Sequence, residues 1–238
     1  MNIVTDSHPI DATASVPAIE DSVRAIYRRR FQDSILARRT AVWKILCTDW
    51  FSNFVAPTDR VLELGAGYCE FINQIAAREK TAVDINPDTR RYAASDVVVV
   101  EADAADLPTV LPAHSFEVAF MSNFLEHCRS RDHLLAILRS LKEVLVPGGR
   151  ILILGPNFRF SYRDYFDFFD HHLALTDRSV AEALEIAGFH VRIALPRTLP
   201  FSFQSGLPSY PWLVRGYLRF PFLRRIFGKQ FFIVAVAD

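Results

Sequence analysis

The chain has 238 residues, half of them hydrophobic, and its 27 Lys and Arg residues balance 27 Asp and Glu residues. This length and apolar content predict one domain with a sizeable core, and a net charge of zero provides no global field that draws the chain to nucleic acid. The three cysteines are widely spaced, without the pairs typical of a metal site or a disulfide framework, so a reducing cytoplasm fits them. No stretch approaches the roughly 18 consecutive apolar residues that a transmembrane helix needs.

The N-terminal part of the chain is expected to be a tail followed by helices. Residues 1–20 are predicted to be a flexible tail, because they lack the basic start and apolar core of a signal peptide. Residues 22–54 are predicted to be helical and to cap a ligand ahead of the first strand. Tyr27 is a candidate ligand contact there. The arginines at 28–30, 38 and 39 could add cations, although a solvated basic face is the interpretation we favour for them.

The most informative segment is Val61-Leu62-Glu63-Leu64-Gly65-Ala66-Gly67. Residues 61–64 are predicted to be a short buried strand, Gly65 and Gly67 a turn that lets the backbone approach a ligand, and residues 71–77 the next helix. Cofactors bind at such strand ends. A tight turn after any buried strand is the structural alternative.

The charges beside this turn indicate the charge of the ligand. A dinucleotide needs glycine at the sixth turn position, so that its pyrophosphate can settle on the helix N-terminus, and here that position is Glu70. Glu63 and Glu70 would repel a pyrophosphate, whereas Glu63 would attract a sulfonium and an α-ammonium group. S-adenosylmethionine carries both of these positive groups.

Four more strands are predicted, with an amphipathic helix at residues 134–145 that a Pro-Gly-Gly turn closes. These strands cover residues 81–85, 97–100, 116–121 and 150–154. Strands and helices alternate, which predicts parallel strands joined by right-handed crossovers, with helices on both faces of the sheet.

Acidic residues stand at the ends of the second and third predicted strands. Asp84 lies about 20 residues past the first strand, where a carboxylate accepts ribose hydroxyls of either a dinucleotide or S-adenosylmethionine. Asp103 could accept a hydrogen bond from an adenine amino group, while the backbone of Ala104 reads the edge of the ring.

These segments resemble class I S-adenosylmethionine-dependent methyltransferases of the methyltransferase-domain 11 and 12 type, over roughly residues 23–193 and the last strand. The residues that carry the resemblance are Glu63-Leu64-Gly65-Ala66-Gly67, Asp84, Asp103-Ala104, Leu125-Glu126-His127 and Val146-Pro147-Gly148-Gly149. The chain departs from the family at Cys69, where a third glycine is usual, so the turn must accommodate a Cβ atom.

The resemblance implies a cofactor, a fold and a domain organisation. The cofactor is S-adenosyl-L-methionine, with Glu63 facing its ammonium group. The fold is α/β, with a Rossmann-like, seven-stranded, mostly parallel sheet, helices on both faces and an antiparallel last strand. Residues 21–238 are expected to form this single methyltransferase domain. The residues expected to bind the cofactor are Tyr27, Glu63, Gly65, Ala66, Gly67, Asp84, Ile85, Asp103, Ala104 and Asn123.

The C-terminal elements complete this fold. Residues 176–187 are predicted to be a helix with Thr176 as its N-cap and Gly188 as its stop. Strand six is expected at residues 190–195, and residues 230–237 match a strand seven that inserts antiparallel between strands five and six.

A basic aromatic insert at residues 201–229 separates the last two strands and contains no acidic residue. We consider three interpretations: a lid over the substrate, a surface that lies on anionic lipid head groups, or two short helices that complete the core. Pro221 interrupts the insert, which argues against one amphipathic membrane helix.

The segment from 158 to 176 follows strand five and mixes aromatic side chains with aspartates and histidines, as a substrate pocket would. His171 and His172 are the candidate general bases, because an imidazole removes a proton from an acceptor hydroxyl near neutral pH. The alternative for each is a histidine that caps a helix or bridges loops.

Asn123, Glu126 and His127 follow strand four. Some methyltransferases of quinone biosynthesis use two glutamates and a histidine in a similar run to hold a divalent ion, but Asn123 replaces the first carboxylate here, so no metal site is expected. Asn123 is expected to contact cofactor or substrate, and His127 to make a supporting hydrogen bond. No pair of prolines follows Asn123, which favours an oxygen or carbon acceptor over nitrogen.

The sequence therefore predicts an S-adenosylmethionine-dependent methyltransferase that methylates an oxygen atom of a small-molecule, saccharide or lipid-linked acceptor. It is expected to be cytoplasmic, with peripheral contact to the inner face of the membrane through the insert left open. The alternatives are a non-catalytic methyltransferase-like binding module and a dinucleotide-dependent oxidoreductase.

Overall fold

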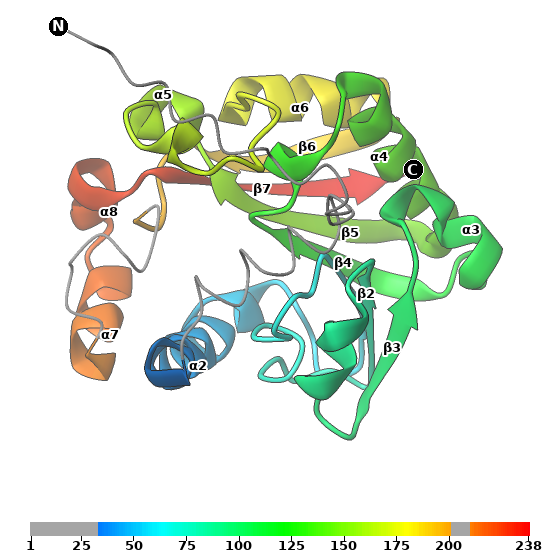
Figure 1. Ribbon diagram of the computed structural model, residues 1–238, viewed down its shortest axis with the longest axis horizontal. Coiled ribbons are helices and arrows are strands. Elements are labelled where there is room, and N and C mark those ends of the chain that lie inside the picture. Colours follow the sequence, from blue (N-terminus) through cyan, green and yellow to red (C-terminus); the bar gives the residue numbers. More distant parts are fainter. Residues whose placement is uncertain (1–32, 201–209) are drawn as a thin grey trace, which may run out of the picture.

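The computed structural model describes residues 33–200 and 210–238, arranged around a seven-stranded sheet of order β3-β2-β1-β4-β5-β7-β6 (Figure 1). The strands are β1 (Arg60–Leu64), β2 (Glu79–Asp84), β3 (Val97–Glu101), β4 (Phe116–Ser122), β5 (Leu145–Pro156), β6 (Phe189–Leu195) and β7 (Gln230–Ala237). Neighbouring strands from β3 to β5 are parallel, and β7 is antiparallel to both β5 and β6. The predicted Rossmann-like sheet with an antiparallel last strand is confirmed.

Helices connect the strands and cover both faces of the sheet (Figure 1). They are α2 (Asp33–Asp49), α3 (Leu107–Val110), α4 (Arg131–Val144), α5 (Phe158–Ser161), α6 (Asp177–Ile186), α7 (Pro211–Arg219) and α8 (Pro221–Phe227). Short 3-10 helices are η1 (Phe51–Asn53), η2 (Pro87–Arg91), η3 (Ala104–Asp106), η4 (Leu125–His127) and η5 (Tyr165–Asp167). Within residues 33–200 and 210–238, no helix has the length and apolar character needed to cross a membrane.

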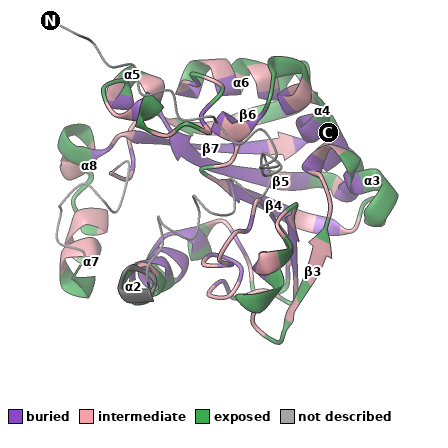
Figure 2. Cartoon of the chain, in the orientation of Figure 1, coloured by how far each residue is buried: buried purple, intermediate pink, exposed green. Residues whose placement is uncertain are grey.

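Two apolar cores lie on opposite faces of the sheet, because successive side chains of a strand point to opposite faces. On β1, Val61 belongs to the core under α2, whereas Leu62 and Leu64 belong to the core under α4 and α6. Figure 2 shows the buried residues along the sheet and on the inner sides of these helices. The central strands are therefore apolar on both faces, which leaves their ends as the places for polar chemistry.

Helix α6 begins and ends as the sequence predicts. The Thr176 hydroxyl accepts a hydrogen bond from the Ser179 N–H, and the Ser179 hydroxyl accepts one from the Thr176 N–H, which forms a capping box. Gly188, directly after the last turn, has a φ of 85°, a left-handed conformation that suits glycine.

The predicted helix at residues 71–77 is wrong: residues 71–74 form turns, and residues 75–77 are a bend and irregular backbone. The Ile72 N–H donates to the Glu63 carboxylate at 3.0 Å, so this N–H cannot donate to a backbone carbonyl as it would in a helix. Cys69, just before the segment, has a φ of 55°, which right-handed helices do not contain. A buried side chain thus competes successfully with the backbone for the hydrogen bond.

Helix α2 ends at Asp49, five residues before the predicted boundary at residue 54. Trp50 has a φ of −129° and a ψ of −59°, which is not helical, and its ring stacks on that of Phe51 at 5.0 Å inside the core. The burial of these two rings outweighs helix propensity. The predicted tail, Tyr27 and the arginines at 28–30 lie outside the described residues.

The parallel strands all end at one edge of the sheet, here called the carboxyl edge. The loops that follow β1, β2, β3, β4 and β5 meet there. Because β7 is antiparallel and its first residue, Gln230, pairs with Pro156 at the end of β5, the segment that leads into β7 joins the same edge. Helices α7 and α8 therefore lie near the loops in which the candidate residues were predicted.

Candidate functional site

The turn after β1 has three residues in a left-handed backbone conformation. The φ angles are 62° at Gly65, 50° at Gly67 and 55° at Cys69. A Cβ atom on Gly65 would collide with the ring of Phe124, so only glycine fits there. The Cys69 side chain is fully buried in this conformation, with its sulfur 3.8 Å from the Thr89 carbonyl oxygen. Cys69 thus adopts the conformation that the usual third glycine would provide.

Asp84 connects this turn to the end of β2. Its Oδ2 accepts a hydrogen bond from the Gly67 N–H at 2.7 Å, and its Oδ1 accepts one from the Asn86 N–H at 2.8 Å. Burial raises the pKa of Asp84, and the two N–H donors oppose that rise. The next side chain, Ile85, is 62% exposed. A carboxylate beside an exposed apolar side chain fits a ribose attached to a flat ring.

Asp103 ends the loop after β3 and is already hydrogen-bonded. Its Oδ1 accepts from the Ala105 N–H at 2.9 Å and lies 3.3 Å from His133 Nε2. Burial alone would raise the pKa of Asp103, but these hydrogen bonds and the charge of Arg129 outweigh burial and lower it. Ala104 is buried behind this carboxylate. The ionised Asp103 can accept one further donor, such as an exocyclic amine.

Glu63 is buried on β1 beneath the turn. Its carboxylate accepts a hydrogen bond from the Ile72 N–H, and burial raises the pKa of Glu63 well above its ordinary value of 4.5. A positive ligand would offset this effect, because an opposite charge favours the ionised carboxylate. The buried Glu63 therefore suits a cationic ligand and disfavours an anionic one.

Glu70 forms an ion pair with Arg39, and this pair changes two of the predictions. Arg39 Nε donates to Glu70 Oε1 at 2.6 Å, and a second guanidinium nitrogen contacts Oε2. The favoured interpretation of a solvated basic face is therefore wrong for Arg39, whereas Arg38 is exposed. Because the charge of Glu70 is compensated, only Glu63 supports the argument against a pyrophosphate.

Asn123 directly follows β4 at the carboxyl edge. It has a φ of 49°, its N–H donates to the Leu154 carbonyl at 2.9 Å, and its exposed side chain contacts the Ser122 hydroxyl at 3.1 Å. A non-glycine residue in the left-handed region is strained, and such strain is concentrated at functional sites. The amide group of Asn123 is available at the edge where the other candidate residues meet.

Four ionisable side chains meet beside Asn123, and we call them the Glu126 cluster: Glu126, His127, Asp170 and His171. His127 Nδ1 lies 2.8 Å from the Asp170 carbonyl oxygen and 3.5 Å from its Oδ2, and the His127 and His171 ring centroids are 5.1 Å apart. Burial raises the pKa of Glu126 to about 7. The cluster combines residues separated by more than forty positions in sequence, which is why the pairing of His127 with Asp170 was not predicted.

Backbone hydrogen bonds hold the two halves of this cluster together. The Glu126 carbonyl oxygen accepts from the N–H groups of His172 and Leu173 at 2.8 and 3.2 Å. His171 is buried, with its ring stacked on Phe168 at 5.0 Å, whereas His172 is exposed. Of the two candidate bases, only His171 therefore belongs to the cluster.

Glu126, His127 and His171 could also hold a metal ion, because each offers one ligand atom and these atoms lie within 4.8 Å of one another. Two imidazoles and a carboxylate suit a divalent transition metal. The sequence-based expectation of no metal was argued from Asn123 and did not consider His171.

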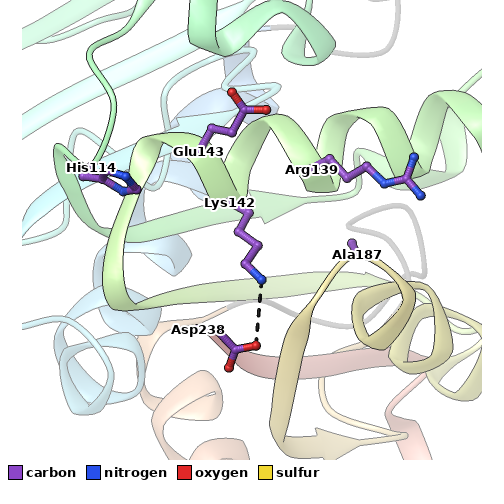
Figure 3. Close-up of a pocket in the computed structure, with 6 residues that line it drawn as sticks. All are labelled: His114, Arg139, Lys142, Glu143, Ala187 and Asp238. Atoms are coloured by element: carbon purple, nitrogen blue, oxygen red, sulfur yellow. Dashed lines mark ion pairs between the residues drawn. The ribbon is translucent and has the colours of Figure 1, made fainter.

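A separate open pocket lies at the opposite edge of the sheet (Figure 3). Its lining includes His114, which precedes β4, Ala187, which precedes β6, and Asp238, which follows the antiparallel β7. Lys142 Nζ lies 3.8 Å from an Asp238 carboxylate oxygen across this pocket. This pocket is therefore distant from the glycine turn and is not part of the candidate site.

Comparison with known proteins finds one family model that matches part of the chain. Residues 62–153 match the family model of the methyltransferase domain, which covers the glycine turn, both acidic strand ends and Asn123 to His127. No curated protein sequence matches the chain.

Several solved structures share the fold. A S-adenosylmethionine-dependent methyltransferase from Archaeoglobus fulgidus is 22% identical, with a TM-score of 0.62 over 83% of this chain and 94% of that one. Phosphoethanolamine N-methyltransferase 2 from Haemonchus contortus, in complex with S-adenosyl-L-methionine, is 16% identical, with a TM-score of 0.61 over 94% and 61%. A possible histamine N-methyltransferase from Thermotoga maritima is 18% identical, with a TM-score of 0.58 over 92% and 96%.

At these identities the structural likeness shows the fold, and the family match adds a methyltransferase domain at residues 62–153. The proteins from Archaeoglobus fulgidus and Haemonchus contortus use or bind S-adenosylmethionine as their cofactor. The buried Glu63, the two strand-end aspartates and the exposed Ile85 fit that cofactor. The dinucleotide and non-catalytic alternatives are set aside. Residues 62–153 therefore carry a methyltransferase domain, and the chain has the fold of S-adenosylmethionine-dependent methyltransferases.

Proposed function

We propose that this methyltransferase acts in the cytoplasm on an oxygen atom of a small-molecule, saccharide or lipid-linked acceptor. The observation that carries the proposal is the Glu126 cluster, because an oxygen acceptor must lose a proton and this cluster provides imidazoles at the carboxyl edge. Amine acceptors, by contrast, are nucleophilic without ionisation of a hydroxyl.

The cofactor is proposed to lie along the carboxyl edge, with Glu63 near its positive groups, Asp84 and Ile85 at its ribose, and Asp103 and Ala104 at its adenine. Gly65, Ala66 and Gly67 would line its methionine portion, and Asn123 would separate it from the acceptor. When bound, S-adenosylmethionine supplies an electrophilic methyl group on a sulfonium. Its orientation toward the acceptor would provide most of the rate, since the leaving group is already activated.

The tautomer of a neutral His127 follows from its hydrogen-bond partner. A carbonyl oxygen can only accept, so the contact with Asp170 requires the proton of a neutral His127 to be on Nδ1, which leaves the lone pair on Nε2. His171 lies against this ring. We infer that the His127 and His171 pair would receive the acceptor proton while the acceptor oxygen bonds to the methyl carbon. The bond between that carbon and sulfur would break, and S-adenosylhomocysteine would leave.

The segment that carries His171 is proposed to bind the acceptor. Tyr165 is buried, its hydroxyl contacts the Leu173 carbonyl at 2.5 Å, and its ring lies 4.8 Å from that of His171. Phe166 and Phe169 are exposed on the same segment. Apolar walls beside a proton acceptor suit an acceptor that combines a hydroxyl with an apolar portion.

The test measures methyl transfer from labelled S-adenosylmethionine to a panel of sugars, phenols and polyprenyl-linked saccharides, with EDTA present because no metal is expected to take part. Once an acceptor is found, H171N and H127N are expected to lower kcat by about 100-fold or more. Both variants should keep their affinity for S-adenosylhomocysteine. H172N is the matched control and should retain near wild-type activity. Full activity of H171N and H127N would exclude this pair as the base.

A further inference from the structure

We propose that the outer side of helices α7 and α8 is a docking surface for a bilayer that contains anionic lipids. The surface consists of Trp212, Arg215, Arg219, Phe220, Phe222, Arg225, Ile226 and Phe227, and we call it the α7–α8 surface. Its proposed partner is the lipid head-group region, with the aromatic rings at the level of the head groups and the arginines on phosphates.

Large apolar side chains on this surface are exposed to solvent. Trp212 is 70% exposed, Ile226 60% and Phe222 59%. Neither α7 nor α8 contains a fully buried residue. The interpretation of the insert as helices that only complete the core is therefore insufficient, since core packing would bury these side chains.

The inner side of the two helices is fixed to the body of the protein. Val214 and Leu218 pack against the core under α2, and the Tyr217 hydroxyl contacts the Thr198 carbonyl. Arg224 lies over the ring of Trp50 at 5.6 Å and donates to the Leu218 carbonyl. The two helices are thus packed against the protein on one side, and the exposed residues lie on the other side.

The charge of this segment complements an anionic surface. Residues 210–229 contain five basic residues and no acidic residue. Asp49 pairs with Arg215 at 3.1 Å, and Asp164 pairs with Lys229 at 2.7 Å. Arg219 and Arg225 are exposed and form no ion pair with a carboxylate of the described part of the chain. A second copy docked through the same face would bring these arginines together, which disfavours a symmetric dimer.

The helices can lie on a membrane but cannot span one. They contain nine and seven residues, and Phe220 breaks the chain direction between them with a φ of −110° and a ψ of 89°. A spanning helix needs about 20 residues. Trp and Phe beside Arg are the residues that bind the interface between head groups and acyl chains.

The position of this surface connects it to the proposed acceptor site. Arg197 donates to the Ile226 and Gly228 carbonyls at 2.8 and 2.7 Å, and the same guanidinium lies 4.7 Å from the centroid of Phe160. The end of α8 is therefore next to the segment that carries His171. This part of the inference rests on the proposed function and favours an acceptor with a lipid tail that stays in the bilayer.

Vesicle sedimentation with the full chain tests the proposal. We compare vesicles of phosphatidylcholine alone with vesicles of equal amounts of phosphatidylcholine and phosphatidylglycerol. The wild type is expected to bind the anionic vesicles about tenfold more strongly, and added salt should weaken that binding. R219E/R225E and W212A/F222A should each lose most of the binding.

The matched controls are exposed residues of the helices on the other side of the sheet. R139E/R178E changes the net charge by the same amount on α4 and α6, and I186A removes a side chain that is 63% exposed. Both should bind like the wild type. Calorimetric binding of S-adenosylhomocysteine by every variant verifies that each one is folded.

Absence of wild-type binding, or equal losses in the controls, would overturn the proposal. A wild-type dimer that W212A/F222A converts to a monomer, without vesicle binding, would identify a second copy as the occupant instead. Vesicle binding needs no acceptor or turnover. Failure to detect methyl transfer would therefore count against the proposed function and leave this result intact.

Discussion

Two buried carboxylates at the carboxyl edge, Glu63 and Glu126, have different neighbours and different expected roles. Glu63 lies beneath the turn, where a cationic ligand would favour its ionised form. Glu126 lies against two imidazoles, and burial raises its pKa to about 7. The fold therefore places groups that resist ionisation where positive charge and protons are expected to arrive.

The pKa of Glu126 makes stability depend on pH. The folded state holds the Glu126 proton more tightly than the unfolded state, in which the pKa is near 4.5, so this contribution is fully present below pH 4.5 and is lost as pH rises through about 7. Glu126→Gln stays neutral. At pH 8 we expect the variant to be more stable than the wild type by on the order of 3 kcal/mol, and at pH 5 nearly equal to it, measured by urea unfolding with EDTA present.

Glu117 is the control, because its pKa is lowered in the folded protein and not raised. Its hydrogen bonds from Arg60 lower its pKa to about 2, so its contribution is present above about pH 4.5 and is lost as pH falls. Glu117→Gln should therefore be less stable than the wild type at pH 8. Identical pH profiles for the wild type and Glu126→Gln would show that Glu126 is not the group that burial perturbs.

At the scale of elements, the turn after β1 is proposed to shape the cofactor site. Gly65 has both a left-handed backbone and the Phe124 ring against its Cα. Phe124 is part of the loop after β4, so this contact sets the separation of two loops that line the site. A change at Gly65 would disturb both of them.

Gly65→Ala is expected to lower the free energy of unfolding by about 2 kcal/mol or more, since left-handed backbone and a steric clash are combined there. S-adenosylhomocysteine binding should be lost. The control is Gly216→Ala in α7, where a Cβ meets no neighbour and alanine favours the helix. Urea unfolding and calorimetry provide the two measurements. Wild-type affinity in Gly65→Ala would show that this turn does not shape the cofactor site.

Some of these elements could be predicted from the sequence and others could not. Strands such as Gln230–Ala237 and the capped helix α6 could be predicted because their apolar patterns and caps are local. The turn at residues 71–77 could not, because the Glu63 side chain takes the Ile72 N–H. Helix propensity depends on neighbouring residues and does not predict a hydrogen bond from a side chain on another element.

The candidate site also has residues that could be predicted from the sequence and residues that could not. Asp84 and Asp103 were predictable because position at a strand end determines their place. The pairings of Arg39 with Glu70 and of His127 with Asp170 join distant segments. Both pairs lie at the carboxyl edge, so the topology contained the information once the strand order was known.

At the scale of the whole molecule, one edge of the sheet collects the proposed cofactor residues, the Glu126 cluster and the entry to the α7–α8 surface. The antiparallel β7 is responsible for the last of these, because it returns the chain to the end of β5. This arrangement places the proposed lipid contact beside the proposed acceptor segment. An acceptor could then be methylated without leaving the membrane surface.

The most direct test of the central claim is calorimetric titration of the purified protein with S-adenosylhomocysteine and, in parallel, with NAD. We expect micromolar binding of S-adenosylhomocysteine, with a binding free energy of about −8 kcal/mol, and no binding of NAD. Binding of NAD alone would contradict the interpretation of Glu63 and of the whole carboxyl edge.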